Sequence, residues 1–357
     1  MLALCRCLCC LLLSASLTGC GLPYYLQAVG GQLELLRKRT PTAELLADPG
    51  IDPDLKAVLS DAVSIRRFAV QELLLPDNKS YTTYVDLQRP YVVWNVIAAE
   101  EFSIEPQRWC FPFAGCVAYR GYFDKAAAED FEAGLVQRGF DTYSGGTSAY
   151  STLGYFADPI LNTMVQGGQE YIAALLFHEL AHQRLYVKSD SEFNEAFATA
   201  VEEYGMEIWL RRTRDEAALR RYLDRMSRRN EFGELVARQR ARLAEIYAGP
   251  EDEAAKRRAK QAAFDLMRQE YATLKASWGG SSEYDGWFER SLNNASLAAV
   301  ATYRHWLPVL RAELDTLGVE GFYAQMDRLA ELSLNEREAW LAARGTGQSA
   351  ASVFPES

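Results

Sequence analysis

Two of the three histidines in the chain stand four residues apart, at His178 and His182, in the run FHELAH. On a helix this spacing puts both imidazoles on one face, one turn apart, where they can bind one Zn²⁺ at about 2.0–2.1 Å. Glu179 follows the first histidine directly, so its carboxylate can reach a zinc-bound water. The pattern predicts metal-assisted hydrolysis, with Glu179 as the general base on that water.

The third metal ligand must come from further along the chain, because a catalytic zinc usually has three protein ligands and one open position. We predict Glu195, thirteen residues after His182, since the first helix can end and a second can cross its ligand face within that distance. Small residues near it would let the two helices approach closely: Ala196, Ala198 and Ala200. Glu192 is the alternative, although a carboxylate there would also suit the start of a helix.

Other side chains are predicted to support the metal site. Glu202 follows Glu195 by seven residues on nearly the same helical face, so it could orient a histidine, and Asn194 is a further predicted neighbour of the ligands. A developing oxyanion needs a hydrogen-bond donor besides the metal, for which Tyr303 is the first candidate and His305 the second. A tyrosine on a helix is also a common core residue, and both roles stay open.

The chain before the motif mixes helical and strand patterns. Leu22 to Leu75 has a helical pattern with a break from Asp48 to Pro53, which predicts two or three helices. Aromatic and β-branched residues then favour strands, and a glycine pair favours a turn. We expect strands at Tyr91–Ile97, Cys116–Tyr122 and Ser148–Leu153, a helix at about Lys125–Gln137 and a turn at Gly145–Gly146.

After Pro159 the chain is predicted to be almost wholly helical. The motif helix should run from about Gln169 to Leu185, and mixed charges favour a long hairpin from Trp209 to Trp278. The predicted fold is therefore α+β and predominantly helical, with a small mixed sheet and a large helical part that carries the metal site. Its expected parts are residues 20–75, 81–160 and 161–344, the last interrupted at Pro308 and Gly318, and a polar tail at 345–357.

The first nineteen residues are predicted to be a signal peptide, because Arg6 precedes an apolar stretch, Leu8 to Leu17, that is too short to span a bilayer. The stretch ends in Leu-Thr-Gly-Cys, which resembles the lipobox of bacterial lipoproteins and implies a lipid anchor at Cys20. Ordinary cleavage without lipid is the alternative. Because Gly21 is not aspartate, the resemblance implies sorting to the outer membrane, with the protein facing the periplasm.

Cys110 and Cys116 are the two cysteines that remain after the signal peptide and Cys20 are set aside. They flank a segment with proline and glycine, so they could close a small loop as a disulfide or stay as free thiols. The charge balance, 48 acidic against 38 basic residues, repels phosphate backbones and argues against a nucleic-acid partner.

HExxH on one helix with a glutamate from the next resembles the gluzincin clan of zinc peptidases. Further segments resemble a family of zinc aminopeptidase lipoproteins of proteobacteria: the lipobox, Cys110–Phe123, Ala149–Asp158, the HELAHQ run with the following NEAFA, and Asn293 through Tyr303. The resemblance covers most of the mature chain. It implies a zincin-like domain that trims the amino termini of peptides, and it implies that an edge strand at Ser148–Leu153 pairs with the substrate. A plain sheet strand is the alternative there.

Two other functions remain open from the residues themselves. One is an endopeptidase of envelope quality control, which a blocked substrate N-terminus would not inhibit. The other is a non-catalytic envelope scaffold with a vestigial zinc site, in which the hairpin binds a partner. Glu179 argues against the scaffold, because a structural zinc needs no general base and usually has a closed fourth position.

Overall fold

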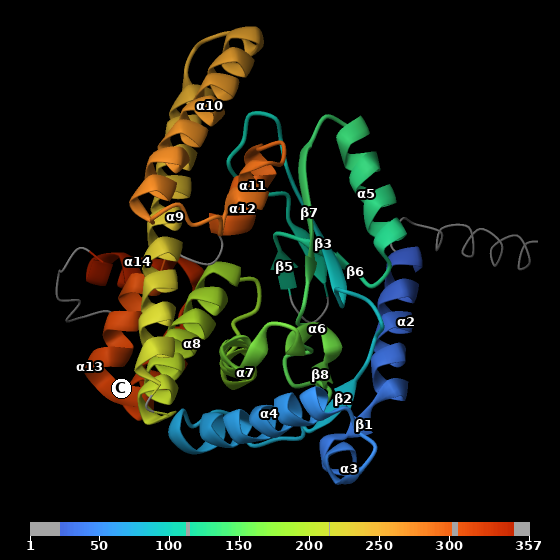
Figure 1. Ribbon diagram of the computed structural model, residues 1–357. Helices are drawn as coiled ribbons and strands as arrows, with labels where there is room; N and C mark the ends of the chain where they lie inside the picture. Colours follow the sequence, from blue (N-terminus) through green and yellow to red (C-terminus); the bar gives the residue numbers. More distant parts are fainter. Residues whose placement is uncertain (1–21, 112–114, 214, 302–305, 346–357) are drawn as a thin grey trace, which may run out of the picture.

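The fold combines a large helical part with small sheets, as Figure 1 shows for the computed structural model. The structure describes residues 22–111, 115–213, 215–301 and 306–345. Helices make up 65% of the chain, which confirms the predicted α+β class with predominant helix. Among the described residues, every helix is too short or too polar to cross a membrane.

Among the described residues, three helices lie in the N-terminal region, up to Glu72. They are α2 (Leu22–Lys38), α3 (Thr42–Ala47) and α4 (Pro53–Glu72). The predicted break lies between α3 and α4, where the Asp52 side chain accepts hydrogen bonds from the backbone of Asp54 and Leu55 and Pro53 occupies the first turn. Helix α4 packs its buried face against the motif helix and lies below it in Figure 1.

In the described part of the chain, the β structure consists of two three-stranded sheets and one hairpin. The mixed sheet has the order β1-β2-β8, with β1 antiparallel and β8 parallel to β2: Thr40–Pro41, Thr83–Val85 and Ile160–Leu161. The antiparallel sheet has the order β6-β3-β7: Arg120–Tyr122, Val93–Ala99 and Asp141–Thr147. Strands β4 (Trp109–Phe111) and β5 (Gly115–Val117) form the hairpin, and a disulfide bond joins Cys110 to Cys116 across it.

Two predictions for β7 and the segment after it were wrong. The glycine pair is no turn but lies inside β7, where Gly145 pairs with Asn95 and Gly146 pairs with Trp94. Glycine is needed at 146 because a Cβ atom there would lie 2.1 Å from the ring of Tyr91. The segment predicted as a strand, Ser148–Leu153, has no strand structure and forms the loop that follows β7.

The helical part begins with the short helix α6 (Asn162–Val165) and the motif helix α7 (Gly168–Arg184). Helix α5 (Lys125–Gln137) has the predicted bounds, whereas Trp209 belongs to α8 (Ser191–Thr213) and the hairpin starts only after it. The hairpin helices are α9 (Glu216–Ala248) and α10 (Glu253–Ser277), which lie side by side in Figure 1. The remaining helices are α11 (Asp285–Phe288), α12 (Asn294–Ala301), α13 (Leu307–Glu331, kinked at Gly318) and α14 (Leu334–Gly345).

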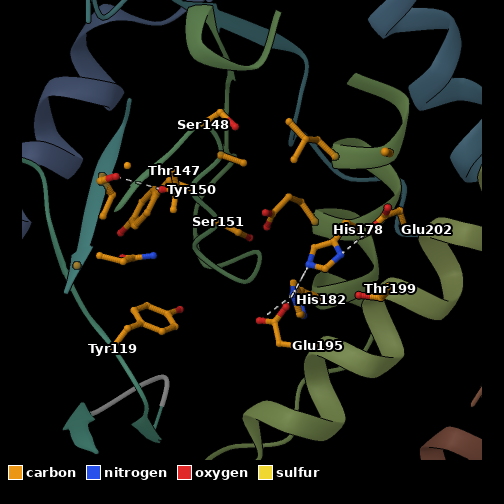
Figure 2. Close-up of a pocket in the computed structure, with 18 of the residues that line it drawn as sticks. Tyr119, Thr147, Ser148, Tyr150, Ser151, His178, His182, Glu195, Thr199 and Glu202 are labelled. Atoms are coloured by element: carbon orange, nitrogen blue, oxygen red, sulfur yellow. Dashed lines mark hydrogen bonds and ion pairs between the residues drawn. The ribbon is translucent and has the colours of Figure 1, made fainter. Parts of the chain in front are cut away.

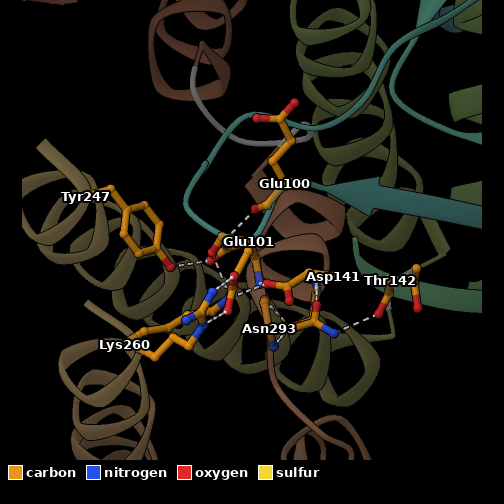
Figure 3. A network of polar contacts seen from close by, with 10 residues as sticks. Glu100, Glu101, Asp141, Thr142, Tyr247, Lys260 and Asn293 are labelled. Carbon is orange, nitrogen blue, oxygen red and sulfur yellow. Dashed lines mark hydrogen bonds and ion pairs between the residues drawn. The ribbon is translucent and has the colours of Figure 1, made fainter. Parts of the chain in front are cut away.

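A buried polar network ties three helices to the ends of β3 and β7 (Figure 3). Asn294 of α12, Tyr247 of α9 and Lys260 of α10 take part in it. The backbone N–H of Asn294 donates to Asp141 at 2.9 Å, and its side-chain amide donates to the carbonyls of Glu100 and Glu101, each at 3.0 Å. The side-chain oxygen Oδ1 of Asn294 accepts from the Tyr247 hydroxyl at 2.8 Å. Every polar atom of this buried amide therefore has a partner, and the network fixes the helical part against the sheet.

Candidate active site

The loop between α7 and α8 sets how the two helices meet. Asn194 stabilises this loop through two hydrogen bonds to the backbone of Val187. Its side-chain oxygen accepts from the Val187 N–H and its side-chain nitrogen donates to the Val187 carbonyl, both at 2.7 Å. Asp190 accepts from the backbone of Phe193 at 3.2 Å and from the buried Arg337 guanidinium at 2.7 Å. Asn194, predicted as a neighbour of the ligands, thus holds the loop, and Arg337 of α14 is a support that sequence reasoning missed.

Helix α8 packs directly against α7, and the predicted small residues are buried. Ala196, Ala198 and Ala200 are fully buried. Glycine is required one turn further on, since a Cβ atom on Gly205 would lie 2.9 Å from the ring of Phe177. This close approach brings the side chain of Glu195, on α8, to the face of α7 that carries His178 and His182.

His178, His182 and Glu195 meet at one point between the two helices (Figure 2). The Nε2 atoms of the histidines are 3.1 Å apart. Glu195 places one carboxylate oxygen 3.3 Å from Nε2 of His178 and the other 3.7 Å from Nε2 of His182. Among the described residues these three form the one group of His, Cys, Asp or Glu side chains that could hold a metal ion, so Glu192 is not part of it.

The donor set fits a divalent metal such as zinc. Tetrahedral ligand atoms at about 2.0–2.1 Å from an ion lie roughly 3.3 Å apart, close to the separations observed here. Two imidazole nitrogens that face each other at 3.1 Å repel through their lone pairs unless a proton or a metal ion lies between them. The oxygen of Glu195 that lies 3.3 Å from Nε2 of His178 is buried and has no further polar partner among the described residues, so a bound cation would complete its contacts.

Glu202 contacts the outer side of this cluster. One of its oxygens lies 3.2 Å from Nδ1 of His178, so Nδ1 can donate to the carboxylate. Nε2 of His178 then keeps its lone pair toward His182 and Glu195. Burial opposes a charge on His178, but hydrogen bonds to Glu195 and Glu202 outweigh it and raise the pKa of the imidazole. Arg229 pairs with Glu202 at 3.5 Å and holds that carboxylate in place.

The cluster opens onto a cavity of about 1700 Å³. Glu179 lines this cavity together with the three clustered side chains, and on the opposite side lie Tyr119 and Tyr150 (Figure 2). The wall is rich in aromatic side chains from several elements, among them Tyr24, Phe111, Phe123, Tyr171, Phe232 and Tyr284. The space is large enough for several residues of an extended peptide and suits large apolar side chains.

The loop after β7 forms one wall of the cavity and is fixed to the motif helix by Asp158. Its carboxylate accepts from the backbone and the hydroxyl of Thr152, at 3.0 and 2.7 Å, and from the Gln183 amide at 3.3 Å. Burial raises the pKa of Asp158 to about 6 against the opposing effect of the hydrogen bonds from Thr152. The carboxylate of Glu179 makes a smaller contribution in the same direction as burial. Sequence reasoning missed this residue, since Asp158 and Pro159 indicate only the end of an element.

Several predicted residues are not placed by the structure. Tyr303 and His305 lie outside the described residues, as does Cys20 with the whole signal peptide. Helix α12 ends two residues before Tyr303, and its Ala299 and Val300 line the cavity. The two oxyanion-donor assignments therefore stay predictions.

The comparison with protein families is decided by one match that covers most of the chain. The model of the family described as "Putative aminopeptidase" matches residues 23–341. The chain belongs to this family. No curated protein and no solved structure matches it. The match spans both cavity walls and the three clustered side chains of this family member, and it supports peptide hydrolysis as the broad activity.

Proposed function

We propose that the chain is a zinc-dependent peptidase that removes amino-terminal residues from peptides in the bacterial envelope. The observation that carries the proposal is the convergence of His178, His182 and Glu195, whose ligand atoms all lie within 4.8 Å of one another at the wall of a large cavity. The aminopeptidase family match is the second support.

The residues around the cluster have distinct roles in this proposal. Bound zinc would polarise the scissile carbonyl and make a water molecule more acidic. Glu179 accepts the proton of that water and passes it to the leaving amine, which is the work of a positioned general base and acid. Glu202 keeps the proton on Nδ1 of His178 and so turns the other ring nitrogen toward the metal. The aromatic wall receives the side chains of the substrate.

The proposed location follows from the N-terminal segment. A signal peptide over residues 1–19 and a lipid on Cys20 would anchor the chain to the outer membrane, facing the periplasm. Labelled palmitate should enter the wild-type chain and not the Cys20→Ala variant. Equal incorporation into both would remove the anchor from the proposal.

Metal analysis together with a substrate screen tests the activity. We expect one zinc per chain, loss of hydrolysis on chelation, recovery on adding zinc, and cleavage of peptides with a free amino terminus but not of their acetylated counterparts. Cleavage of both kinds would indicate the endopeptidase. A chain that binds zinc and cleaves neither would favour the scaffold.

A further inference from the structure

Helix α2 exposes a row of large apolar side chains, which we call the apolar stripe of α2. Its five members are between 41% and 63% exposed: Leu22, Tyr25, Leu26, Val29 and Leu33. At about 100° of rotation per residue they fall within an arc of roughly 100°, so they form one continuous face of the helix. Exposed apolar residues that gather on one face are typical of an interaction surface, whereas scattered ones are not.

The stripe is free of charge over three turns. From Leu22 to Leu33 the helix contains no Asp, Glu, Lys or Arg, and charged residues appear only in its last two turns, at Glu34, Arg37 and Lys38. The exposed Leu266 on α10 differs, because it lies between Asp265 and Arg268. The exposed leucine of α10 is therefore part of a solvated, charged surface, but the stripe is not.

The opposite face of α2 is already occupied by its own fold. Leu35 is buried, and Gly31 lies against Phe123, whose ring a Cβ atom would meet at 2.0 Å. Tyr24 and Gln32 line the cavity from the same side. The helix is thus held with one face toward the cavity and the other away from the described part of the chain, along one edge of the molecule (Figure 1).

We infer that the apolar stripe of α2 lies in the surface of a lipid bilayer. Leu22 follows the predicted lipid attachment site, Cys20, by two residues, so an anchor there brings the stripe to the membrane at once. A helix with an apolar face and basic residues at its border, here Arg37, is suited to the boundary between headgroups and acyl chains. The inference uses the proposed anchor for this proximity and is independent of the peptidase activity.

The charge of the chain indicates what kind of contact this is. With a net charge of −10 the protein gains no overall attraction to anionic headgroups, so apolar burial of the stripe must supply the binding. Because α2 also lines the cavity, the membrane contact would hold one wall of the cavity next to the bilayer and would favour substrates that arrive along its surface.

Fluorescence quenching in vesicles tests this arrangement. The full mature chain carries an environment-sensitive dye on Val29→Cys, or on Leu266→Cys as an exposed control outside the stripe, and is reconstituted in phosphatidylethanolamine and phosphatidylglycerol vesicles. Lipids with a nitroxide on the acyl chain should quench the dye at 29 at least twofold more than the dye at 266. The quenching should not depend on the phosphatidylglycerol content.

A second variant separates bilayer contact from other occupants. Leu26→Asp combined with Val29→Asp should at least halve the quenching of a dye on Leu33→Cys, with an unchanged circular dichroism spectrum. Equal quenching at 29 and 266 would overturn the inference. So would a dye at 29 that is shielded without vesicles, because a second copy or the N-terminal segment would then cover the stripe. Palmitate labelling of the same preparations reports separately on the anchor.

Discussion

Two buried polar centres of the molecule are built on opposite rules. Around Asn294, donors meet acceptors: its amide and carbonyl are satisfied, and Lys260 donates to Asp141 at 2.6 Å. Between α7 and α8, with neutral imidazoles, acceptors outnumber donors: the two imidazole Nε2 atoms are 3.1 Å apart beside the Glu195 carboxylate. A matched centre stabilises the fold by itself, whereas an unmatched one costs stability until a cation completes it.

This contrast separates structure from function without reference to any family. Both centres contain buried charged or amide side chains, so burial alone does not distinguish them. What differs is whether buried polar atoms lack partners: among the described residues, Nδ1 of His182 has no hydrogen-bond partner, and one oxygen of Glu195 has only the imidazole of His178 beside it. Substitutions in the unmatched centre should change activity or metal binding, and those in the matched centre should change stability.

The largest expected effect is on turnover. Glu179→Gln removes the proposed general base but keeps the shape of the side chain, so kcat should fall by about 10³-fold. The zinc content and the melting temperature should stay those of the wild type, because no ligand and no core contact is lost. Peptide hydrolysis with metal analysis and a thermal melt of the same sample measures all three.

The control for this variant is Glu192→Gln, an acidic residue in the first turn of α8 that lies outside the ligand cluster. It should retain both zinc and turnover. Full activity in Glu179→Gln would refute the base assignment, and loss of zinc in Glu192→Gln would move the third ligand from Glu195 to Glu192.

The next effect concerns stability. Asn294→Ala would remove three hydrogen bonds of a buried side chain, two to the carbonyls of Glu100 and Glu101 and one from the hydroxyl of Tyr247, which should cost about 3 kcal/mol of the free energy of unfolding. The two carbonyls keep Ser103 N–H and Lys260 as donors. Urea denaturation measures the loss. Zinc affinity of the folded variant should be unchanged. A stable variant with weakened zinc binding would break the distinction between the two centres.

The sequence predicted the centre whose residues are close in the chain and missed the one whose residues are not. His178, Glu179 and His182 share one helix, and the helical repeat alone places them on one face. Glu195 could be chosen because only a short loop separates the helices. Asn294 has partners 47 residues away at Tyr247 and 194 residues away at Glu100, and no local pattern indicates contacts over such distances.

The same physical reason explains the errors in the sheet. Gly145 and Gly146 have the composition of a turn. Only the ring of Tyr91, which lies two residues before β3, shows why β7 needs glycine at position 146. The loop after β7 owes its shape to the buried Asp158, which contacts Gln183 on another element. Contacts between elements decide both positions, and single-sequence patterns do not contain them.

The smallest effect tests the support of the ligands. Glu202→Gln weakens the acceptor for Nδ1 of His178, so zinc affinity should fall by about 10- to 100-fold. Its matched control is the adjacent Glu203→Gln, since Glu203 is also buried and also pairs with Arg229. That variant should lose stability and keep its affinity for zinc, because Glu203 is outside the ligand cluster. Competition with a chromophoric chelator measures both affinities, and equal losses in the two variants would show that Glu202 acts only through the ion pair with Arg229.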